Sequence, residues 1–242
     1  MEFTEFESLF QRSLAQNGIE PLSNERIERF FRFTNHLMAV NEHTNLTAIR
    51  TIPEIITKHY LDSLLVSPLL PRGAQVLDLG CGPGFPSIPL AIARPDLSIT
   101  ALDSTEKKIR FVKESAAILA LDNLSAFAGR AEDRKTMAAL GKFDVVVSRA
   151  VARLNVLCEL CLPYASVGGS LIAMKAAKAE EELSEAQNAI KTLGGKESTA
   201  HTQTLTLLSG ETEPRTLIEI PKAAETPSIY PRIYATIQKK PL

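Results

Sequence analysis

Residues 76–90 read VLDLGCGPGFPSIPL, and they join a short apolar run to a segment of helical character. Between the two lie three alternating glycines, at positions 80, 82 and 84. Because glycine lacks a Cβ atom, its backbone adopts positive φ readily and approaches a ligand closely. The stretch therefore predicts a buried strand, a tight glycine turn and a helix, which together form the first unit of an open α/β sheet.

Apolar runs of the same kind recur after this unit. They are short, non-alternating and rich in β-branched residues, which is typical of strands buried on both faces of a parallel sheet. We expect five such strands, over 74–79, 98–103, 124–128, 143–148 and 170–175, with helices near 85–94, 106–121, 131–140, 152–166 and 177–194. Two further runs, 202–208 and 216–222, flank a polar loop and predict an antiparallel hairpin at one edge. This α/β pattern resembles the methyltransferase form of the doubly wound, Rossmann-like sheet more than the six-parallel-strand dinucleotide form.

The first 72 residues have a helical period instead. Apolar residues recur at three-to-four spacing over 3–14 and over 27–38, which predicts two amphipathic helices. A third helix is expected from about Pro53 to Leu70. We therefore expect two domains, an N-terminal helical cap over residues 1–72 and a ligand-binding α/β domain over residues 73–242 that ends in a basic tail.

Composition limits the class of protein. The chain has 242 residues, 45% of them hydrophobic, and a formal net charge of −1, which is ordinary for a globular protein and provides no overall field to attract polyanions. Three cysteines and the absence of an apolar N-terminal segment predict a reduced, cytoplasmic protein. The longest weakly charged stretch, residues 160–174, is too short for a membrane span and contains Pro163, Gly168 and Gly169. We expect Cys158 and Cys161 to be small buried hydrophobes, and we expect no metal site.

The residues around the glycine turn limit its ligand. No Gly-Lys-Ser/Thr follows, which excludes a triphosphate-binding P-loop. Ser87 stands where a dinucleotide fingerprint has its third glycine, and Pro86 and Pro89 remove amide donors that a pyrophosphate would use. An acid followed by alternating glycines fits a loop that binds S-adenosylmethionine (SAM).

Four residues are the cofactor candidates from this pattern. Asp78 precedes the loop and would accept hydrogen bonds from the amino group of SAM, while Gly80 and Gly82 let the backbone approach it. Asp103 ends the next strand, a little over twenty residues later, where a carboxylate binds ribose hydroxyls. Together they predict a nucleoside-type ligand.

Eight motifs, among them the glycine turn itself, occur in order along nearly the whole chain: NLTAIR (45–50), KHYLDSL (58–64), DLGCGPGFPSIPLAI (78–92), LDSTEKK (102–108), GRAED (129–133), SRAVARL (148–154), GGSLIAMK (168–175) and YPRIYATIQKKPL (230–242). This set resembles the bacterial 16S ribosomal RNA guanine-N7 methyltransferases, the glucose-inhibited division protein B family. The chain departs from the family pattern at Ser87, where glycine is usual, and at Ala235 and Ile237, where glycine and proline are usual.

The resemblance implies which residues bind the cofactor and what the protein modifies. Its SAM-binding positions match Gly80, Phe85, Asp103, Ser104, Thr105, Ala131, Glu132 and Arg149. It implies a guanine in the decoding-region loop of 16S rRNA as the target, and the small ribosomal subunit or an assembly intermediate of it as the partner. We expect the protein to be a monomer.

The residues after the fourth strand agree with that chemistry. They read SRAVA, without the Asn/Asp-Pro-Pro-aromatic motif of exocyclic-amine methyltransferases and without the cysteine nucleophile of cytosine-C5 enzymes. Guanine N7 presents a lone pair and no proton, so its methylation requires alignment rather than a general base. We expect Arg149 to donate to guanine O6 or to a phosphate, and Ser148 or backbone groups to align the ring.

Some alternatives stay open on the sequence alone. A small-molecule methyltransferase and a SAM- or RNA-binding regulator without turnover both fit the glycine loop. His59 and Asp62 form either a helix-surface pair or part of a pocket that the cap closes, together with Asn45.

The tail over 222–242 has four Lys or Arg against one Glu, so we expect it to contact phosphates, with Arg130, Arg149, Arg153 and Lys175 extending the basic surface.

Overall fold

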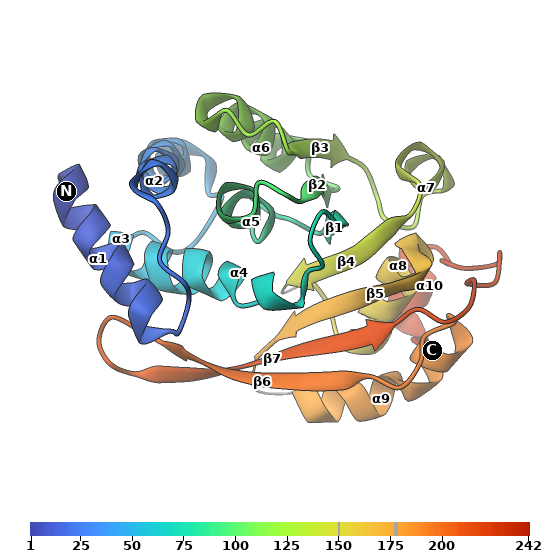
Figure 1. The fold of residues 1–242 in the computed structure, drawn as a ribbon. Coiled ribbons are helices and arrows are strands. Elements are labelled where there is room, and N and C mark those ends of the chain that lie inside the picture. Colours follow the sequence, from blue (N-terminus) through green and yellow to red (C-terminus); the bar gives the residue numbers. More distant parts are fainter. Residues whose placement is uncertain (150, 177–178) are drawn as a thin grey trace.

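The computed structural model describes residues 1–149, 151–176 and 179–242 of the chain. Within this part, seven strands form one sheet in the order β3-β2-β1-β4-β5-β7-β6 (Figure 1). The strands are β1 Gln75–Leu79, β2 Ser98–Asp103, β3 Leu124–Ala128, β4 Phe143–Arg149, β5 Ala165–Lys175, β6 Thr199–Thr206 and β7 Thr212–Pro221. β1 to β5 pair in parallel, and the β6–β7 hairpin adds to β5 in antiparallel fashion. The predicted fold class, with its terminal hairpin, is therefore confirmed.

Helices cover both faces of the sheet (Figure 1). They are α1 Phe3–Gln16, α2 Asn24–Thr44, α3 Ile52–Glu54, the π-helix η1 Ile55–Leu61, α4 Asp62–Leu64, the 3-10 helix η2 Ser67–Leu69, α5 Ser87–Ala93, α6 Glu106–Leu119, α7 Arg134–Leu140, α8 Leu154–Cys161, the 3-10 helix η3 Leu162–Tyr164, α9 Ala179–Thr192 and α10 Tyr234–Lys239. Along β4, Val145 and Val147 face α1 to α6, while Val146 between them faces α8 and α9. This alternation explains why the strand sequences are apolar without a break.

The N-terminal helices share one apolar core with the sheet. Phe6, Phe30 and Tyr60 are fully buried and belong to the same cluster as Val76 and Ile99 of the central strands. The side chain of Ser23 accepts a hydrogen bond from the Arg26 amide, as expected of the α2 N-cap. Burial is therefore continuous across residue 72, although the secondary structure changes there from helices to a sheet.

Two elements differ from the sequence-based expectation. The third helix is not a single α-helix from Pro53 to Leu70, because η1 interrupts it with π-type bonds between α3 and α4. The helix expected near 152–166 ends at Cys161, and β5 begins at Ala165 instead of residue 170. Pro163 explains the second difference, since it stands within the short 3-10 turn that replaces the last helical turn.

Candidate functional site

The glycine turn after β1 adopts the backbone that only glycine tolerates easily. Gly80, Gly82 and Gly84 have φ of +80°, +56° and +98°. A Cβ atom at Gly80 would lie 2.3 Å from Cγ2 of Val151, whereas one at Gly82 would meet nothing within 4 Å. The turn thus packs tightly against the loop after β4 at one glycine and presents a bare backbone at the next.

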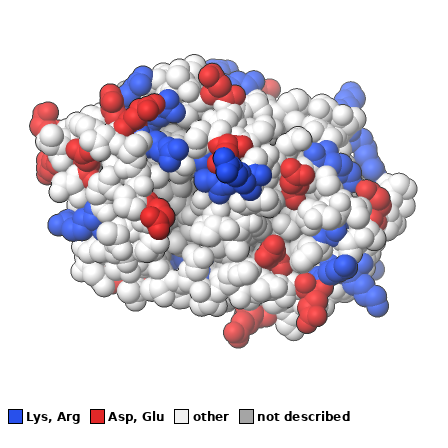
Figure 2. Space-filling view, viewed as in Figure 1, with Lys and Arg blue, Asp and Glu red and all other residues white. Residues whose placement is uncertain are grey.

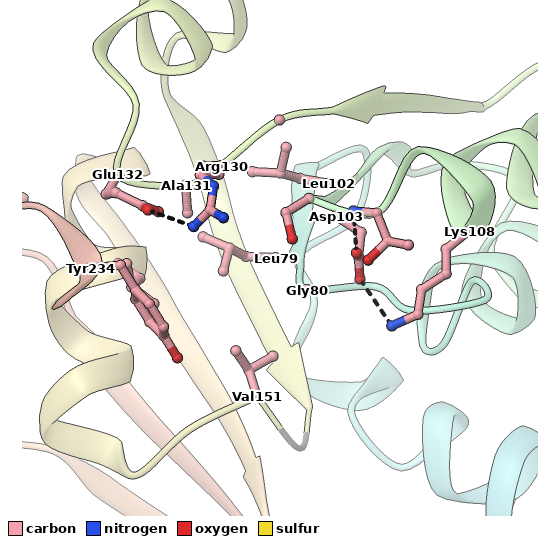
Figure 3. A pocket seen from close by; sticks show the side chains of 14 residues that line it. Leu79, Gly80, Leu102, Asp103, Lys108, Arg130, Ala131, Glu132, Val151 and Tyr234 are labelled. Carbon is pink, nitrogen blue, oxygen red and sulfur yellow. Dashed lines mark hydrogen bonds and ion pairs between the residues drawn. The ribbon is translucent and has the colours of Figure 1, made fainter. Parts of the chain in front are cut away.

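Asp103, at the carboxyl end of β2, holds this turn in place. Its Oδ2 accepts from the Gly82 amide at 3.0 Å, and its Oδ1 accepts from the Thr105 amide at 2.8 Å. Nζ of Lys108 lies 3.8 Å from Oδ2 of Asp103 (Figure 3). The predicted pairing of the glycine turn with Asp103 is therefore a direct contact between neighbouring parallel strands.

A cavity of about 330 Å³ opens between these elements, and we call it the β2 cavity. Figure 3 shows Asp103 and Lys108 on one side of it and Tyr234 on the opposite side. The residues that line it are Leu79, Gly80, Leu102, Asp103, Ser104, Thr105, Lys108, Gly129, Arg130, Ala131, Glu132, Val151, Leu160 and Tyr234. Six of the cofactor candidates are among them: Gly80, Asp103, Ser104, Thr105, Ala131 and Glu132.

Asp78 occupies a different position from the other candidates. It is 1% exposed, does not line the β2 cavity, and accepts the Ser87 amide at 2.9 Å at the start of α5. Its Oδ1 has no hydrogen-bond partner among the described residues. Burial raises the pKa of Asp78 to about 7, although hydrogen bonds from Ser87 and the charge of Arg149 lower it in part. Asp78 therefore holds the loop from its buried side, through the Ser87 amide. Its contact with the amino group of SAM stays a prediction.

A second cavity, of about 210 Å³, lies between the glycine turn and the N-terminal helices; we call it the cap cavity. Gly82, Phe85 and Arg149, the remaining cofactor candidates, line it together with Thr47 and His59. The His59 ring stacks on the Phe85 ring with centroids 4.1 Å apart, and its Nε2 lies 2.8 Å from the Thr47 hydroxyl. Burial, assisted by the charge of Arg149, lowers the pKa of His59 to about 3, so this imidazole is neutral at neutral pH.

Arg149, at the end of β4, is held by the cap. Its Nη1 donates to the Lys58 carbonyl at 3.0 Å and to Oδ2 of Asp62 at 2.8 Å. Asp62 is buried, and its Oδ1 accepts from Nε of Arg215 at 2.6 Å. Asp62 thus bridges arginines from β4 and β7 and is no isolated helix-surface pair with His59. Asn45, in contrast, is exposed in the left-handed conformation that ends α2.

A third cavity, of about 440 Å³, lies on the other side of Arg149, and we call it the Lys175 cavity. Its described lining combines apolar and charged side chains: Asp62, Leu65, Arg149, Val151, Ala152, Met174, Lys175, Ala176, Glu182, Arg215 and Leu217. Lys175 is itself paired with Glu182 at 2.7 Å. Each pair of these cavities shares a lining residue. Gly80 lines both the β2 and the cap cavity, Val151 lines both the β2 and the Lys175 cavity, and Arg149 lines both the cap and the Lys175 cavity. The three cavities therefore meet around these residues.

Ser148 does not face this meeting point. It is fully buried, and its hydroxyl donates to the Leu79 carbonyl at 2.7 Å, which ties β4 to β1. It is absent from the described lining of all three cavities. This position favours a structural role over the substrate contact expected from the sequence.

The expected basic surface is smaller than the tail sequence indicates. Lys222 is 2% exposed and donates to the Leu193 carbonyl, and Arg232 is bound to the fully buried Glu159. Arg153 pairs with Glu181 and Glu185. On the face drawn in Figure 2, basic and acidic side chains are interspersed. Lys239 and Lys240 remain as exposed tail cations.

Other expectations concern cysteines, metals and membranes. Cys158 and Cys161 are fully buried in α8, and burial raises the pKa of Cys158 to about 12, so the interpretation as buried hydrophobes is confirmed. Among the described residues, no three His, Cys, Asp or Glu side chains gather in a way that could hold a metal ion. In the same part of the chain, no helix combines the length and apolar character required to cross a membrane.

Several lining residues were not identified from the sequence. Val151 and Leu160 follow β4 as ordinary apolar residues, and Tyr234 comes from the tail, more than a hundred residues from the glycine turn. Arg215 and Glu182 likewise reach the Lys175 cavity only through the pairing of β7 with β5 and the packing of α9. No local pattern marks these positions, because only the tertiary fold brings them to the site.

Two solved structures with a similar fold are named as methylating enzymes. An O-methyltransferase from Bacillus cereus, solved in complex with SAH, matches 91% of this chain and 100% of its own, with a TM-score of 0.57 and 17% sequence identity. The ribosomal protein L11 methylase from Lactobacillus delbrueckii subsp. bulgaricus matches 69% of this chain and 79% of its own, with a TM-score of 0.50 and 16% identity. At these identities the likeness concerns the fold, which is that of the class I SAM-dependent methyltransferases.

Sequence relatives are similar over nearly the whole chain. Three bacterial proteins named ribosomal RNA small subunit methyltransferase G illustrate this. The protein of Exiguobacterium sp. is 43% identical over 239 residues, covering 98% of this chain and 99% of its own. The proteins of Limosilactobacillus reuteri and Brevibacillus brevis are 45% and 44% identical, each covering 96% of this chain and 98% of its own. The model of the GidB family, described as rRNA small subunit methyltransferase G, matches residues 26–207. The chain therefore belongs to the GidB family of SAM-dependent methyltransferases.

Proposed function

We propose that this protein methylates N7 of a specific guanine in the decoding-region loop of 16S rRNA, with SAM as the methyl donor. The observation that carries the proposal is the meeting of three cavities around Gly80, Arg149 and Val151 at the carboxyl ends of β1 and β4. In an open α/β sheet this edge is the ligand-binding edge. Membership in the GidB family supports rRNA as the substrate class.

The described residues fit SAM. The β2 cavity is within the range of about 300–1,000 Å³ typical of small-molecule sites. Asp103 supplies a carboxylate for ribose hydroxyls, and Leu79, Leu102 and Leu160 supply apolar walls for a base. The bare backbone of Gly82 faces the cap cavity, where the amino-acid end of the cofactor would pass. When bound, SAM supplies an electrophilic methyl group.

The Lys175 cavity is the proposed site of the acceptor base, since it adjoins both other cavities. Guanine N7 carries a lone pair and no proton, so no side chain has to act as a base. Arg149 lines this cavity, and Asp62 and the Lys58 carbonyl hold its guanidinium. This arrangement supports the proposed role of Arg149 as a donor to guanine O6 or to a phosphate. The contribution of the chain is then positioning, which supplies on the order of 7–11 kcal/mol in well-oriented reactions.

Transfer of radiolabelled methyl groups from SAM tests this function. Small ribosomal subunits, protein-free 16S rRNA and a mixture of small metabolites are each incubated with the protein, and labelled RNA is mapped for N7-methylguanine by chemical cleavage at the modified base. We expect label in one guanine of the decoding-region loop. Light scattering of the same preparation should show a monomer.

Two other outcomes would contradict the proposal. Label in a small molecule alone would show a small-molecule methyltransferase, and calorimetric binding of SAM without transfer to any ribosomal substrate would show a regulator. Comparing intact subunits with stripped rRNA in the same assay also decides which of them is the substrate.

A further inference from the structure

The C-terminal segment Tyr230–Lys239 is fixed to the body of the protein by two contacts of its own and by one contact just before it. Arg232 donates from Nε, Nη2 and its backbone amide to the carboxylate of Glu159, which is fully buried in α8. Ile237 is fully buried in the core beside the same helix. Arg134 of α7 donates to the Ser228 carbonyl just before the segment. The segment is therefore part of the packed fold.

These contacts place one aromatic ring in the β2 cavity. Tyr234, the first residue of α10, lies between the two anchors Arg232 and Ile237 and lines the cavity together with Leu160 of α8. Its hydroxyl accepts a hydrogen bond from Gln238 one helical turn later, at 3.0 Å. Figure 3 shows the ring across the cavity from Asp103.

We propose that Tyr234 forms the aromatic wall on which the adenine of SAM packs, so that the C-terminal segment is a cofactor-binding element. The two sides of the β2 cavity differ in chemistry: Asp103 offers a carboxylate for the ribose, and Tyr234 offers a π surface for the base. Aromatic rings gain free energy beyond simple area burial when they stack on a planar partner. This inference rests on the proposed assignment of the β2 cavity to the nucleoside of SAM.

Calorimetric binding of two ligands tests the proposal without any turnover. S-adenosylhomocysteine has both the nucleoside and the amino acid, whereas 5′-methylthioadenosine has only the nucleoside. Tyr234→Ala should weaken both ligands by the same factor, about tenfold, because it removes a contact to their common part. Tyr234→Phe keeps the ring and should bind both within about twofold of the unchanged protein.

Two controls accompany these variants. Ile233→Ala, at a neighbouring side chain that is 71% exposed, should leave both affinities unchanged. Thermal unfolding of every variant shows whether it is folded, and Tyr234→Leu, which keeps the bulk without the ring, replaces the alanine variant if that one unfolds.

Tyrosine fluorescence gives an independent readout, since the chain has four tyrosines and no tryptophan. Stacking on adenine should quench part of the emission of the unchanged protein, and Tyr234→Phe should lose that quenching while it still binds. Unchanged affinity of folded Tyr234→Ala or Tyr234→Leu would overturn the proposal. Failure of the unchanged protein to bind either ligand would instead contradict the cofactor assignment itself.

Discussion

At the scale of residues, the site depends on carboxylates that hold other groups in place. Asp103 binds the amides of Gly82 and Thr105, and Asp62 binds two arginines. Both are buried, so the loss of either charge would leave its partners without compensation in a poorly solvated environment. The same geometry that stabilises the fold therefore orients the groups proposed to meet cofactor and substrate.

Arg149→Ala should lower kcat/KM for 16S rRNA by roughly 100-fold, a magnitude typical of losing one preorganised donor at a reacting group. Its matched control is Arg153→Ala, which removes the same charge from an exposed side chain outside the described lining of the three cavities. Initial rates and melting temperatures of both variants are compared. Equal rates for folded Arg149→Ala and the unchanged protein would remove this arginine from the site.

Asp78 should make the stability of the ligand-free protein depend on pH. The pKa of Asp78 is raised to about 7 in the folded protein, so the folded state binds the proton more tightly than the unfolded state does. The free energy of unfolding therefore falls as pH rises from about 4 through 7. Asp78→Asn removes this titration, and the difference in unfolding free energy between the two proteins should shift in favour of Asn by as much as about 4 kcal/mol over that interval. Urea unfolding at pH 5 and at pH 8 measures the part of the shift that falls between these pH values, about 3 kcal/mol. A constant difference would show that Asp78 titrates normally.

At the scale of elements, the β1–α5 turn and the cap segment η1 place the residues of the site. The turn needs positive φ at three glycines to bring the backbone onto the loops after β2 and β4. In η1, π-type bonds precede α4, and the segment presents Lys58 and His59 and, next to it, Asp62 toward Arg149. Single π-type turns are frequent at functional sites, where they alter which side chains share a helix face.

Substitutions of two glycines in one turn should differ in their cost. The Cβ that Gly82→Ala adds would meet no atom within 4 Å. This variant should therefore lose only about 1 kcal/mol of stability, which is the cost of a left-handed backbone at a residue with a Cβ. Gly84→Ala has a φ of +98° and would place its Cβ 2.4 Å from Cδ1 of Ile88, so it should lose about 3 kcal/mol or more. Denaturant unfolding of both variants tests the order, which would be refuted if Gly82→Ala were the more damaging.

At the scale of the whole molecule, the cap is bound to the sheet by a common core and by the ion pairs of Asp62. The contacts across residue 72 include that of Phe33, whose ring centroid lies 5.7 Å from that of Phe85 in the glycine turn. The division into domains 1–72 and 73–242 stays a prediction about folding units. We expect the second of them to aggregate when produced alone, because it would expose the apolar surface that α1 and α2 cover.

Binding to rRNA should weaken with salt in proportion to the phosphates contacted. Replacing both Lys239 and Lys240 by alanine should reduce the slope of log K against log salt by about 1.4, at roughly 0.7 for each contact to a single strand. The control replaces Lys191 and Lys196, two exposed lysines outside the tail and outside the described lining of the three cavities. Filter binding at several salt concentrations gives the slopes. Equal slopes for the two double variants would show that the tail does not contact phosphate.

The sequence by itself determined the sheet, the glycine turn and the pairing of that turn with Asp103. These follow from hydrophobic runs, from residues that tolerate positive φ and from the rule that carboxyl ends of parallel strands share an edge, all of which act over short stretches or through regular topology. Net charge and order along the chain do not show that Lys222 is buried or that the Ser148 hydroxyl donates to the Leu79 carbonyl, so the positions of these two side chains were found only in the structure.

Only the tertiary structure decided what surrounds the cofactor loop. Arg215 reaches Asp62 from β7, and Tyr234 reaches the β2 cavity from α10, although each is far away along the chain. Such contacts depend on how whole elements pack and on which buried charges find partners, as Arg232 does at Glu159. Packing of this kind depends on the combined shape and burial of many side chains, so a local sequence pattern does not predict it.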